Sequence, residues 1–475
     1  MGNAKAFLTI NRKEAGYRLV VDRIADFSEV EQTLNTEDRI LQASRCMECG
    51  VPFCHWACPL GNIIPEWQDL LYKAKWFEAY SILSSTNNFP EFTGRICPAL
   101  CEKSCVLNLE GQPLTVRENE AAIAEHAFQE SYIKPQPPLI WTGEKVAIVG
   151  SGPSGLAAAD MLNKKGYMVT IYEKDESIGG LLRLGIPDFK LNKGVIDRRL
   201  NLLEKEGIRF EVGIEVGKDI PAGKLLSQFD AVCLATGSAV PRDLSVEGRK
   251  LKGIHFALDF LKQQNRMVAG QVIDSDRQIS AKNKRVLVIG GGDTGSDCVG
   301  TSIRQKARKV TQIEILPQPP EKYNPDTPWP YYPNILKTSS SHMEGCERRW
   351  SLATKRFIGE NGNVNGVEVV EVEWLKDENG RFFMNETTKT EIISAELVLL
   401  SIGFMHPEQE GLLNELGVRY DVRGNVEAIR PNESSVAGVF VAGDATLGAG
   451  LVVRAIDSGR KAAEAIAKYL EIKNN

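Results

Sequence analysis

Seven of the ten cysteines lie within residues 46–105, where they form two groups. The groups are Cys46-x2-Cys49-x4-Cys54-x3-Cys58, followed by proline, and Cys97-Pro-x2-Cys101-x3-Cys105. Thiolates spaced two to four residues apart can converge on one small inorganic core, and dense four-cysteine runs that end in Cys-Pro usually hold iron–sulfur clusters. The segment is therefore predicted to transfer electrons. Seven cysteines are one ligand short of two four-iron clusters, so the eighth ligand must be another side chain.

Zinc and disulfides are alternative interpretations of the same cysteines. Structural zinc usually takes two separated CxxC pairs or a Cys/His mixture, and here only Cys46 and Cys49 form such a pair. Disulfides suit a small secreted domain, whereas this segment belongs to a long chain with no signal-peptide pattern at its start. Metal-type clustering of the cysteines favours a reducing cytoplasm as the location.

Composition is that of an ordinary globular protein. The chain has 475 residues, 43% of them hydrophobic and 25% charged, which suffices for two or three domains. The formal net charge is -5 and no basic run is present, so we expect no nucleic-acid partner. The longest apolar stretches are only strand-sized, so we expect no membrane span.

A strand that runs into a glycine turn begins at Lys145. The turn is Gly150-Ser-Gly152-Pro153-Ser154-Gly155, a helical pattern follows, and a second strand ends at Glu173. In such a unit the first glycine permits the tight turn, the second lets backbone amides approach a pyrophosphate, and the third allows close helix packing. The acid binds a ribose hydroxyl. Strand, glycines, helix and acid together predict a dinucleotide site.

The same unit recurs about 140 residues later. A strand from Arg285 enters Gly290-Gly-Gly292-Asp293-Thr294, and the next strand, 310–316, carries Glu314. Two units imply two nucleotides, of which one can be a tightly held flavin and the other a nicotinamide that supplies hydride.

Several further glycine-rich motifs supply candidate cofactor-binding residues. They are Gly180, Leu181, Arg183 and Ile186 after the first unit, Ala235, Thr236 and Gly237 after a strand, and Gly443, Asp444, Gly450, Leu451 and Val452 near the C-terminus. Asp444 could accept a hydrogen bond from a flavin ribityl chain. Amides at the start of the last helix could face the pyrimidine end of the flavin, where negative charge develops on reduction.

Helices should position the cysteines. A helix with Thr36 as its N-cap would deliver Cys46, one or two amphipathic helices are predicted within 63–83, and another within 116–132 carries Glu120. The proline-rich stretch 135–138 would then be a linker, and the proline-rich segment 317–350 a long surface loop near the nicotinamide site or a partner.

Together, the cysteine groups, GSGPSG, GGLLRLGIP, ATG, GGGDTGSDC, EILPQPP and AGDATLGAGLVVRAI resemble the small (beta) subunit of glutamate synthase. The resemblance implies FAD in the first unit, NAD(P)H in the second and two [4Fe-4S] clusters in the N-terminal domain. One cluster would take Cys46, Cys49, Cys54 and Cys105, and the other Cys58, Cys97, Cys101 and Glu120. A solvated helix-face glutamate is the alternative for Glu120.

The implied architecture is α/β: two Rossmann-like nucleotide-binding domains, one inserted in the other, after an all-α iron–sulfur domain. We expect the cluster domain at 1–140, the FAD domain at 144–245 and 395–475, and the NAD(P)H domain at 246–394. The implied role is electron input to a large FMN-containing subunit that makes glutamate from glutamine and 2-oxoglutarate, in a hetero-oligomer. A stand-alone or differently partnered NAD(P)H:acceptor oxidoreductase, including a bifurcating one, is the alternative.

Hydride transfer needs geometry more than acid–base groups, so no catalytic acid or base is predicted. The sequence does not choose as clearly between NADH and NADPH as the hydride donor. Glu314 by itself favours NADH, whereas NADPH calls for a basic residue. Bacterial proteins that resemble this one are often NADPH-dependent, so we expect NADPH, with Arg304, Arg308 or Lys309 as the basic residue.

Overall fold

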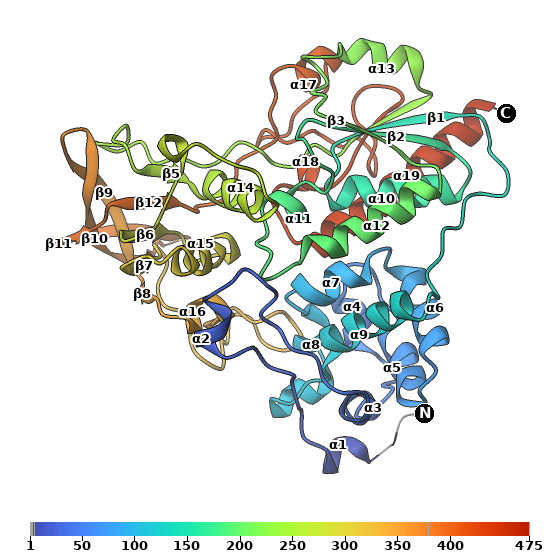
Figure 1. The fold of residues 1–475 in the computed structure, drawn as a ribbon, viewed down its shortest axis with the longest axis horizontal. Helices are drawn as coiled ribbons and strands as arrows, with labels where there is room; N and C mark the ends of the chain where they lie inside the picture. The colour runs from blue at the N-terminus through green and yellow to red at the C-terminus, as the bar shows by residue number, and fades with distance from the viewer. Residues whose placement is uncertain (1–2, 4, 379, 475) are drawn as a thin grey trace.

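The computed structural model describes residues 3, 5–378 and 380–474 (Figure 1). Helices gather in the N-terminal part of the chain, and two five-stranded sheets and one three-stranded sheet follow. Among the described residues, no helix combines the length and apolar character that a membrane crossing would require.

Short helices build the N-terminal domain. They are α1 (Ala6–Thr9), α2 (Val20–Arg23), α3 (Thr36–Ser44), α4 (Phe53–Ala57), α5 (Ile64–Tyr72), α6 (Trp76–Thr86), α7 (Pro90–Ile96), α8 (Leu100–Lys103), η1 (Val106–Glu110) and α9 (Val116–Gln129). Trp67, Leu71, Leu83 and Ile123 are fully buried in its core, against which several of the cysteines pack. The helix cap differs from the prediction: Asn35, not Thr36, caps α3, because its side chain accepts a hydrogen bond from the Asp38 amide.

The first sheet is wholly parallel, with the order β13-β4-β1-β2-β3. Its strands are β1 (Lys145–Val149), β2 (Met168–Glu173), β3 (Arg209–Val212), β4 (Ala231–Leu234) and β13 (Val439–Val441). The associated helices are α10 (Pro153–Lys164), α11 (Leu181–Leu184), α12 (Lys193–Lys205), α13 (Ala222–Gln228), α17 (Leu412–Leu416), α18 (Asp444–Leu447) and α19 (Val452–Asn474). Alternate β1 residues belong to different core clusters, Ile148 to one and Ala147 to the other, so both faces of the sheet are covered.

The second sheet is also parallel, with the order β5-β12-β6-β7-β8. Its strands are β5 (Ile254–Phe256), β6 (Arg285–Ile289), β7 (Lys309–Ile313), β8 (Glu347–Arg349) and β12 (Leu397–Leu400), with α14 (Ala257–Val268), η2 (Ser275–Arg277), α15 (Asp293–Arg304) and α16 (Ser340–Met343). An antiparallel sheet of β9 (Leu352–Glu360), β10 (Asn363–Lys376) and β11 (Phe382–Ser394) extends from it (Figure 1).

Strand β12 shifts one expected boundary. The sequence predicts that residues from 395 onward belong to the first nucleotide domain, but β12 pairs with β5 and β6 in the second sheet. A four-residue apolar run fits the centre of either parallel sheet, so the sequence alone does not choose between them. The chain therefore returns to the first sheet only after residue 400.

Two crossings connect the nucleotide domains, and they run side by side. Met405 N donates to Val240 O at 2.8 Å, Arg242 N donates to Gly403 O at 2.9 Å, and Val240 N donates to His406 O at 3.1 Å. We call residues 239–242 and 403–406 the two-stranded linker.

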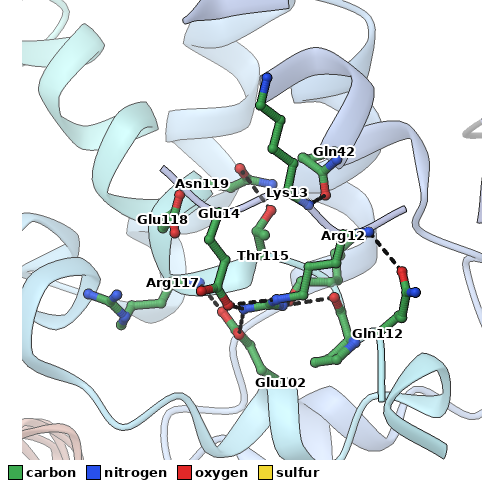
Figure 2. A network of polar contacts seen from close by, with 12 residues as sticks. Arg12, Lys13, Glu14, Gln42, Glu102, Gln112, Thr115, Arg117, Glu118 and Asn119 are labelled. Carbon is green, nitrogen blue, oxygen red and sulfur yellow. Dashed lines mark hydrogen bonds and ion pairs between the residues drawn. The ribbon is translucent and has the colours of Figure 1, made fainter. Parts of the chain in front are cut away.

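The N-terminal arm, residues 10–31, lies against the cluster domain. Figure 2 shows Arg12 reaching Glu102, with Nη2 2.7 Å from Oε2, while the Arg12 amide donates to Gln112 Oε1 at 2.8 Å. Beside them, the buried Arg45 donates from Nε to Ile10 O at 2.9 Å. The arm thus meets the domain directly beside Cys46.

Candidate functional site

The first glycine turn leaves space only where a ligand would need it. Gly150 has φ +105°, and a Cβ there would lie 2.3 Å from Ala235 O, so only glycine fits. A Cβ on Gly152 would meet no atom within 4 Å. The backbone at Gly152 therefore faces open space at the beginning of α10, where helix amides point toward a ligand.

A cavity of about 410 Å³, within the usual range for small-molecule sites, opens at this turn. Thirteen predicted cofactor residues line it: Gly150, Gly152, Pro153, Ser154, Glu173, Gly180, Leu181, Ala235, Thr236, Gly237, Asp444, Gly450 and Val452. Gly155 and Gly443 pack beneath the wall instead, since a Cβ on them would lie 2.0 Å from Gly150 O and 2.5 Å from Ser154 Oγ.

Three predicted residues, Arg183, Ile186 and Leu451, are not among those that line this cavity. Arg183 donates from Nε to Ile178 O at 2.6 Å and pairs with Asp197 on α12. Its guanidinium thus holds the loop and does not face a ligand.

The cavity holds two carboxylates with different surroundings. Glu173 Oε2 accepts bonds from the Ser151 amide at 3.1 Å and the Ser151 hydroxyl at 2.5 Å, which fixes it beside the glycine turn. Burial raises the pKa of Asp444 to about 6, although a hydrogen bond from the Gly450 amide favours its charged form.

A second cavity lies at the second glycine turn. It is lined by five residues predicted to bind a nucleotide: Gly290, Gly292, Asp293, Thr294 and Glu314. Glu314 Oε2 accepts a 2.5 Å bond from the Gly291 amide, and Oε1 accepts a 2.9 Å bond from the Ile315 amide. This carboxylate is therefore held at the carboxyl end of β7, at the edge where open α/β sheets bind ligands.

The two cavities adjoin. Both are lined by Leu181, Ser238, Leu258, Asp444 and Gly450. Ligands in the two cavities would therefore meet at a shared wall.

Sequence reasoning missed two segments of the second cavity. They are 256–258, at the end of β5, and 400–404, at the end of β12. The Ser-Ile-Gly sequence after the apolar run of β12 was an available signal, because it repeats the pattern of a strand that enters a glycine turn.

The expectation for a 2′-phosphate ligand is corrected by the structure. Arg304 is at the far end of α15 from the glycine turn, and its buried side chain pairs with Glu344, with Nη1 2.5 Å from Oε2. Arg308 and Lys309 are at the start of β7, and Lys309 Nζ is 2.6 Å from Glu347 Oε2. In a parallel sheet the start of β7 is the edge opposite Glu314, so these residues cannot reach the nucleotide that Glu314 would bind.

The four cysteines predicted to bind one cluster, called the first cysteine group from here on, surround a small cavity. Cys46, Cys49, Cys54 and Cys105 line it, together with apolar side chains that include Phe53, Ile64, Leu107, Leu114 and Val116. Burial raises the pKa of Cys46 and of Cys54 to about 12, so iron would have to displace their protons on binding. Four thiols around one apolar space fit a four-iron cluster.

Cys58, Cys97 and Cys101, the cysteines predicted to bind the other cluster, are called the second group below. Burial raises their pKa values, and the nearby charge of Glu120 raises them further. Burial raises the pKa of Glu120 to about 7. Thr93 Oγ1 and Asn87 Nδ2 donate to Oε1 of this carboxylate, so it belongs to the interior and is not a solvated helix-face glutamate. No three His, Cys, Asp or Glu within residues 3, 5–378 and 380–474 form a group that could hold a single metal ion.

The proline-rich loop contacts the cluster domain. The ring centroids of Trp329 and Phe53 lie 4.7 Å apart, and Trp329 Nε1 donates to Cys105 O at 3.3 Å. Ser104 Oγ donates to Pro330 O at 2.6 Å. The loop therefore covers the chain beside the first cysteine group.

Comparisons with known proteins agree with this arrangement. Residues 23–132 match the family described as dihydropyrimidine dehydrogenase domain II, 4Fe-4S cluster, and residues 144–459 match the pyridine nucleotide-disulphide oxidoreductase family. The glutamate synthase [NADPH] small chain of Mycobacterium tuberculosis H37Rv is 48% identical over 97% of this chain and 94% of its own length. This chain belongs to the glutamate synthase small-chain family.

Other relatives of this small-chain family member differ in length. The Bacillus subtilis glutamate synthase [NADPH] small chain is 40% identical over 99% of both chains. The Schizosaccharomyces pombe glutamate synthase [NADH] is 43% identical over 97% of this chain but only 22% of its own length. There the small-chain region is part of a much longer polypeptide.

A solved structure shares the fold of the nucleotide domains. Mycobacterium tuberculosis FprA in complex with NADPH superposes with a TM-score of 0.55 at 19% identity, over 71% of this chain and 86% of FprA. The predicted fold class is thereby confirmed: Rossmann-like domains with parallel sheets follow an iron–sulfur domain. The chain is an oxidoreductase of the electron-transfer type.

Proposed function

We propose that this chain is the electron-input subunit of a glutamate synthase. Electrons would pass from NADPH through FAD and two [4Fe-4S] clusters to a large FMN-containing subunit, which makes glutamate from glutamine and 2-oxoglutarate. The single observation that supports this path best is the wall that the two nucleotide cavities share.

FAD belongs in the first cavity and the nicotinamide nucleotide in the second. When bound, FAD supplies the chemistry, since it takes electrons as a pair from hydride and releases them singly. The protein's own contribution is positioning. Amides at Gly152 and at Gly292 would hold the two pyrophosphates, Glu173 and Glu314 the riboses, and the shared residues Leu181 and Asp444 the region where the ligands meet.

Each cysteine group would hold one cluster. Cys46, Cys49, Cys54 and Cys105 would bind the first, and Cys58, Cys97, Cys101 and Glu120 the second. Leu60 and Ile96, each close in sequence to a cysteine of the second group, pack against the core of the first nucleotide domain. This packing supports an order in which electrons leave the flavin through the second group and exit through the first.

The choice of NADPH follows the Mycobacterium tuberculosis and Bacillus subtilis relatives, both of which are glutamate synthase [NADPH] small chains. Arg348, on β8, is the basic residue we assign to the 2′-phosphate. It pairs in register with Gln312 near the carboxyl end of β7, and the Glu314 amide donates to the carbonyl of the next residue, Arg349, at 2.9 Å. Arg348 Nη1 lies 3.4 Å from Thr338 Oγ1, a neutral group.

The partner and setting are proposals of the same kind: a hetero-oligomer with the large subunit, in the cytoplasm. The decisive test is copurification of the chain with its large subunit and anaerobic assay of glutamine-dependent NADPH oxidation. If the chain reduces artificial acceptors but binds no large subunit and supports no glutamate formation, it is instead a stand-alone or differently partnered oxidoreductase.

The cluster assignment has its own test. The purified chain should hold about eight irons, and Cys105→Ser should lower this to about four by removing the first cluster. Cys346→Ser, far from both groups in sequence, is the matched control and should keep the iron content unchanged. Equal iron in wild type and Cys105→Ser would overturn the assignment.

A further inference from the structure

The nicotinamide domain needs more than its covalent connections to stay in place. Its two crossings form the two-stranded linker, which fixes one end of the domain. Domains joined in this way are expected to move relative to each other unless a second interface holds them. Hydride transfer, however, depends on near-ångström placement of two ligands.

Along α14, Arg266 pairs with Glu176 and Asn265 donates to Leu184 O at 2.8 Å, so this helix also holds the domain. A further attachment is a buried ion cluster at the opposite end of α15 from the nucleotide. Arg23 Nε, from the N-terminal arm, is 2.8 Å from Glu344 Oε1, and Arg304 Nη1 is 2.5 Å from Glu344 Oε2. All three side chains are at most 2% exposed. Arg23 Nη2 also donates to Ser340 O at 2.8 Å, and Figure 1 shows α2 beside α16.

The same arm is bonded to the other two domains. Val30 N donates to Phe189 O at 3.0 Å in the first nucleotide domain, and the Asn192 amide donates to Glu29 Oε1 at 2.9 Å. Arg95 of the cluster domain places Nε 2.8 Å from the same Glu29 oxygen. The arm therefore joins all three domains.

Phe189 connects these contacts to the nucleotide turn. Its ring centroid lies 3.9 Å from the Arg304 guanidinium carbon, and a Cβ on Gly300 would lie 2.9 Å from Phe189 Cζ. Its neighbour Lys190 forms a partly buried ion pair with Asp297. Helix α15 begins at Asp293 in the second cavity and ends at Arg304 in the ion cluster, so holding one end orients the other.

We propose that Arg23 is a positioning residue for hydride transfer. It fixes the nicotinamide domain against the flavin domain so that the shared wall of the two cavities stays assembled. The kinetic part of this inference depends on the proposed function, whereas the structural part does not.

Arg23→Met is the variant that tests it. Glu344 keeps Arg304 as its partner, so the change leaves no unpaired buried carboxylate. In the FAD- and cluster-loaded protein without nicotinamide, we expect amide hydrogen exchange in 186–191 and 296–304 to become at least about 10-fold faster. In anaerobic stopped flow with NADPH, flavin reduction should slow by about 10-fold or more, while the apparent KM changes by less than about 3-fold. Arg23→Lys should restore part of both.

The matched control is Arg18→Met, in the same arm, because Arg18 pairs with Asp26 within the arm. It should leave exchange and flavin reduction within about 2-fold of wild type. Gly300→Ala is the second variant, since its methyl group would lie 2.5 Å from Ser341 Oγ and 2.9 Å from Phe189 Cζ, and so would disturb the packing of α15 against both α16 and Phe189 without removing a charge. It should reproduce the kinetic effect if Arg23→Met does not fold.

Wild-type exchange and wild-type flavin reduction in folded Arg23→Met would overturn the inference. A wild-type protein whose flavin no nicotinamide reduces would instead overturn the proposed function, and the exchange measurement would still decide the role of Arg23.

Discussion

Arg199 of α12 and Glu91 of α7 form a buried ion pair between the flavin domain and the cluster domain. Arg199 Nε lies 2.6 Å from Glu91 Oε1, and Nη2 lies 3.1 Å from Oε2. The side chains are 5% and 0% exposed, so water cannot replace either partner. The Glu91 charge raises the pKa of Arg199, although burial alone would lower it.

Breaking this pair should weaken the attachment of the flavin domain to the cluster domain and lower the free energy of unfolding. Arg199→Met leaves the Glu91 carboxylate buried and uncompensated, which we expect to cost about 3–5 kcal/mol in the free energy of unfolding. The double variant Arg199→Met/Glu91→Gln should recover most of that loss. Chemical denaturation of the two variants checks both values, and a single variant as stable as wild type would contradict the role given to the pair.

Two glycines of one turn should respond differently to the same substitution. Gly150→Ala places a methyl group against Ala235 O, so we expect poor folding and no bound flavin. Gly152 has φ -65° and no atom within 4 Å of its Cβ position, so the Gly152→Ala protein should fold normally. Its methyl group would occupy the place of the pyrophosphate, so its affinity for flavin should fall. Circular dichroism and flavin absorbance after gel filtration separate the outcomes. Normal flavin content in Gly152→Ala would contradict the placement of the pyrophosphate.

Asp444 should make the flavin-free protein less stable as pH rises. Burial raises its pKa to about 6, above its value in the unfolded chain, so the folded state binds an extra proton between about pH 4 and 6. The cost of ionising it is absent below this window and complete above it. Asp444→Asn should therefore be more stable than wild type by about 1–3 kcal/mol at pH 7 and by about half as much at pH 5. Urea denaturation at the two pH values gives the difference, and an advantage that does not depend on pH would exclude this titration.

Nucleotide preference should depend on Arg348 and not on Lys309. Arg348→Ala should lower kcat/KM for NADPH by about 10-fold, because a charged hydrogen bond to the 2′-phosphate is lost, and should leave NADH nearly unchanged. Lys309→Ala is the matched control at the opposite end of β7 and should change neither value. Steady-state kinetics with both nucleotides decide between them. A loss confined to the Lys309 variant would reverse the assignment.

Local sequence was sufficient for the parts of the site that lie close together in the chain. The glycine turns and the acids Glu173 and Glu314 each follow from spacing within one βαβ unit. Spacing also indicates that the cysteines bind iron–sulfur clusters, but their distribution over two clusters came from the family resemblance. The boundary at β12 and the residues at 400–404 depend on strand order, which a short apolar run does not encode. Arg304 was misassigned because its sequence position says nothing about Glu344, which is 40 residues away and pairs with it. The contact of Arg23 with Glu344 could not be predicted from the sequence for the same reason.

Because of the two-stranded linker, the nicotinamide domain could be replaced as a unit by a related domain. Both of its entry points lie next to each other in space, because residues 239–242 pair with residues 403–406. The nicotinamide domain of another dehydrogenase could therefore be joined to this chain at two neighbouring points, one within residues 239–242 and one within residues 403–406. The transplanted domain would also need its own counterpart of the Arg304–Glu344 pair, because Arg23 of the N-terminal arm would otherwise lack an ion-pair partner.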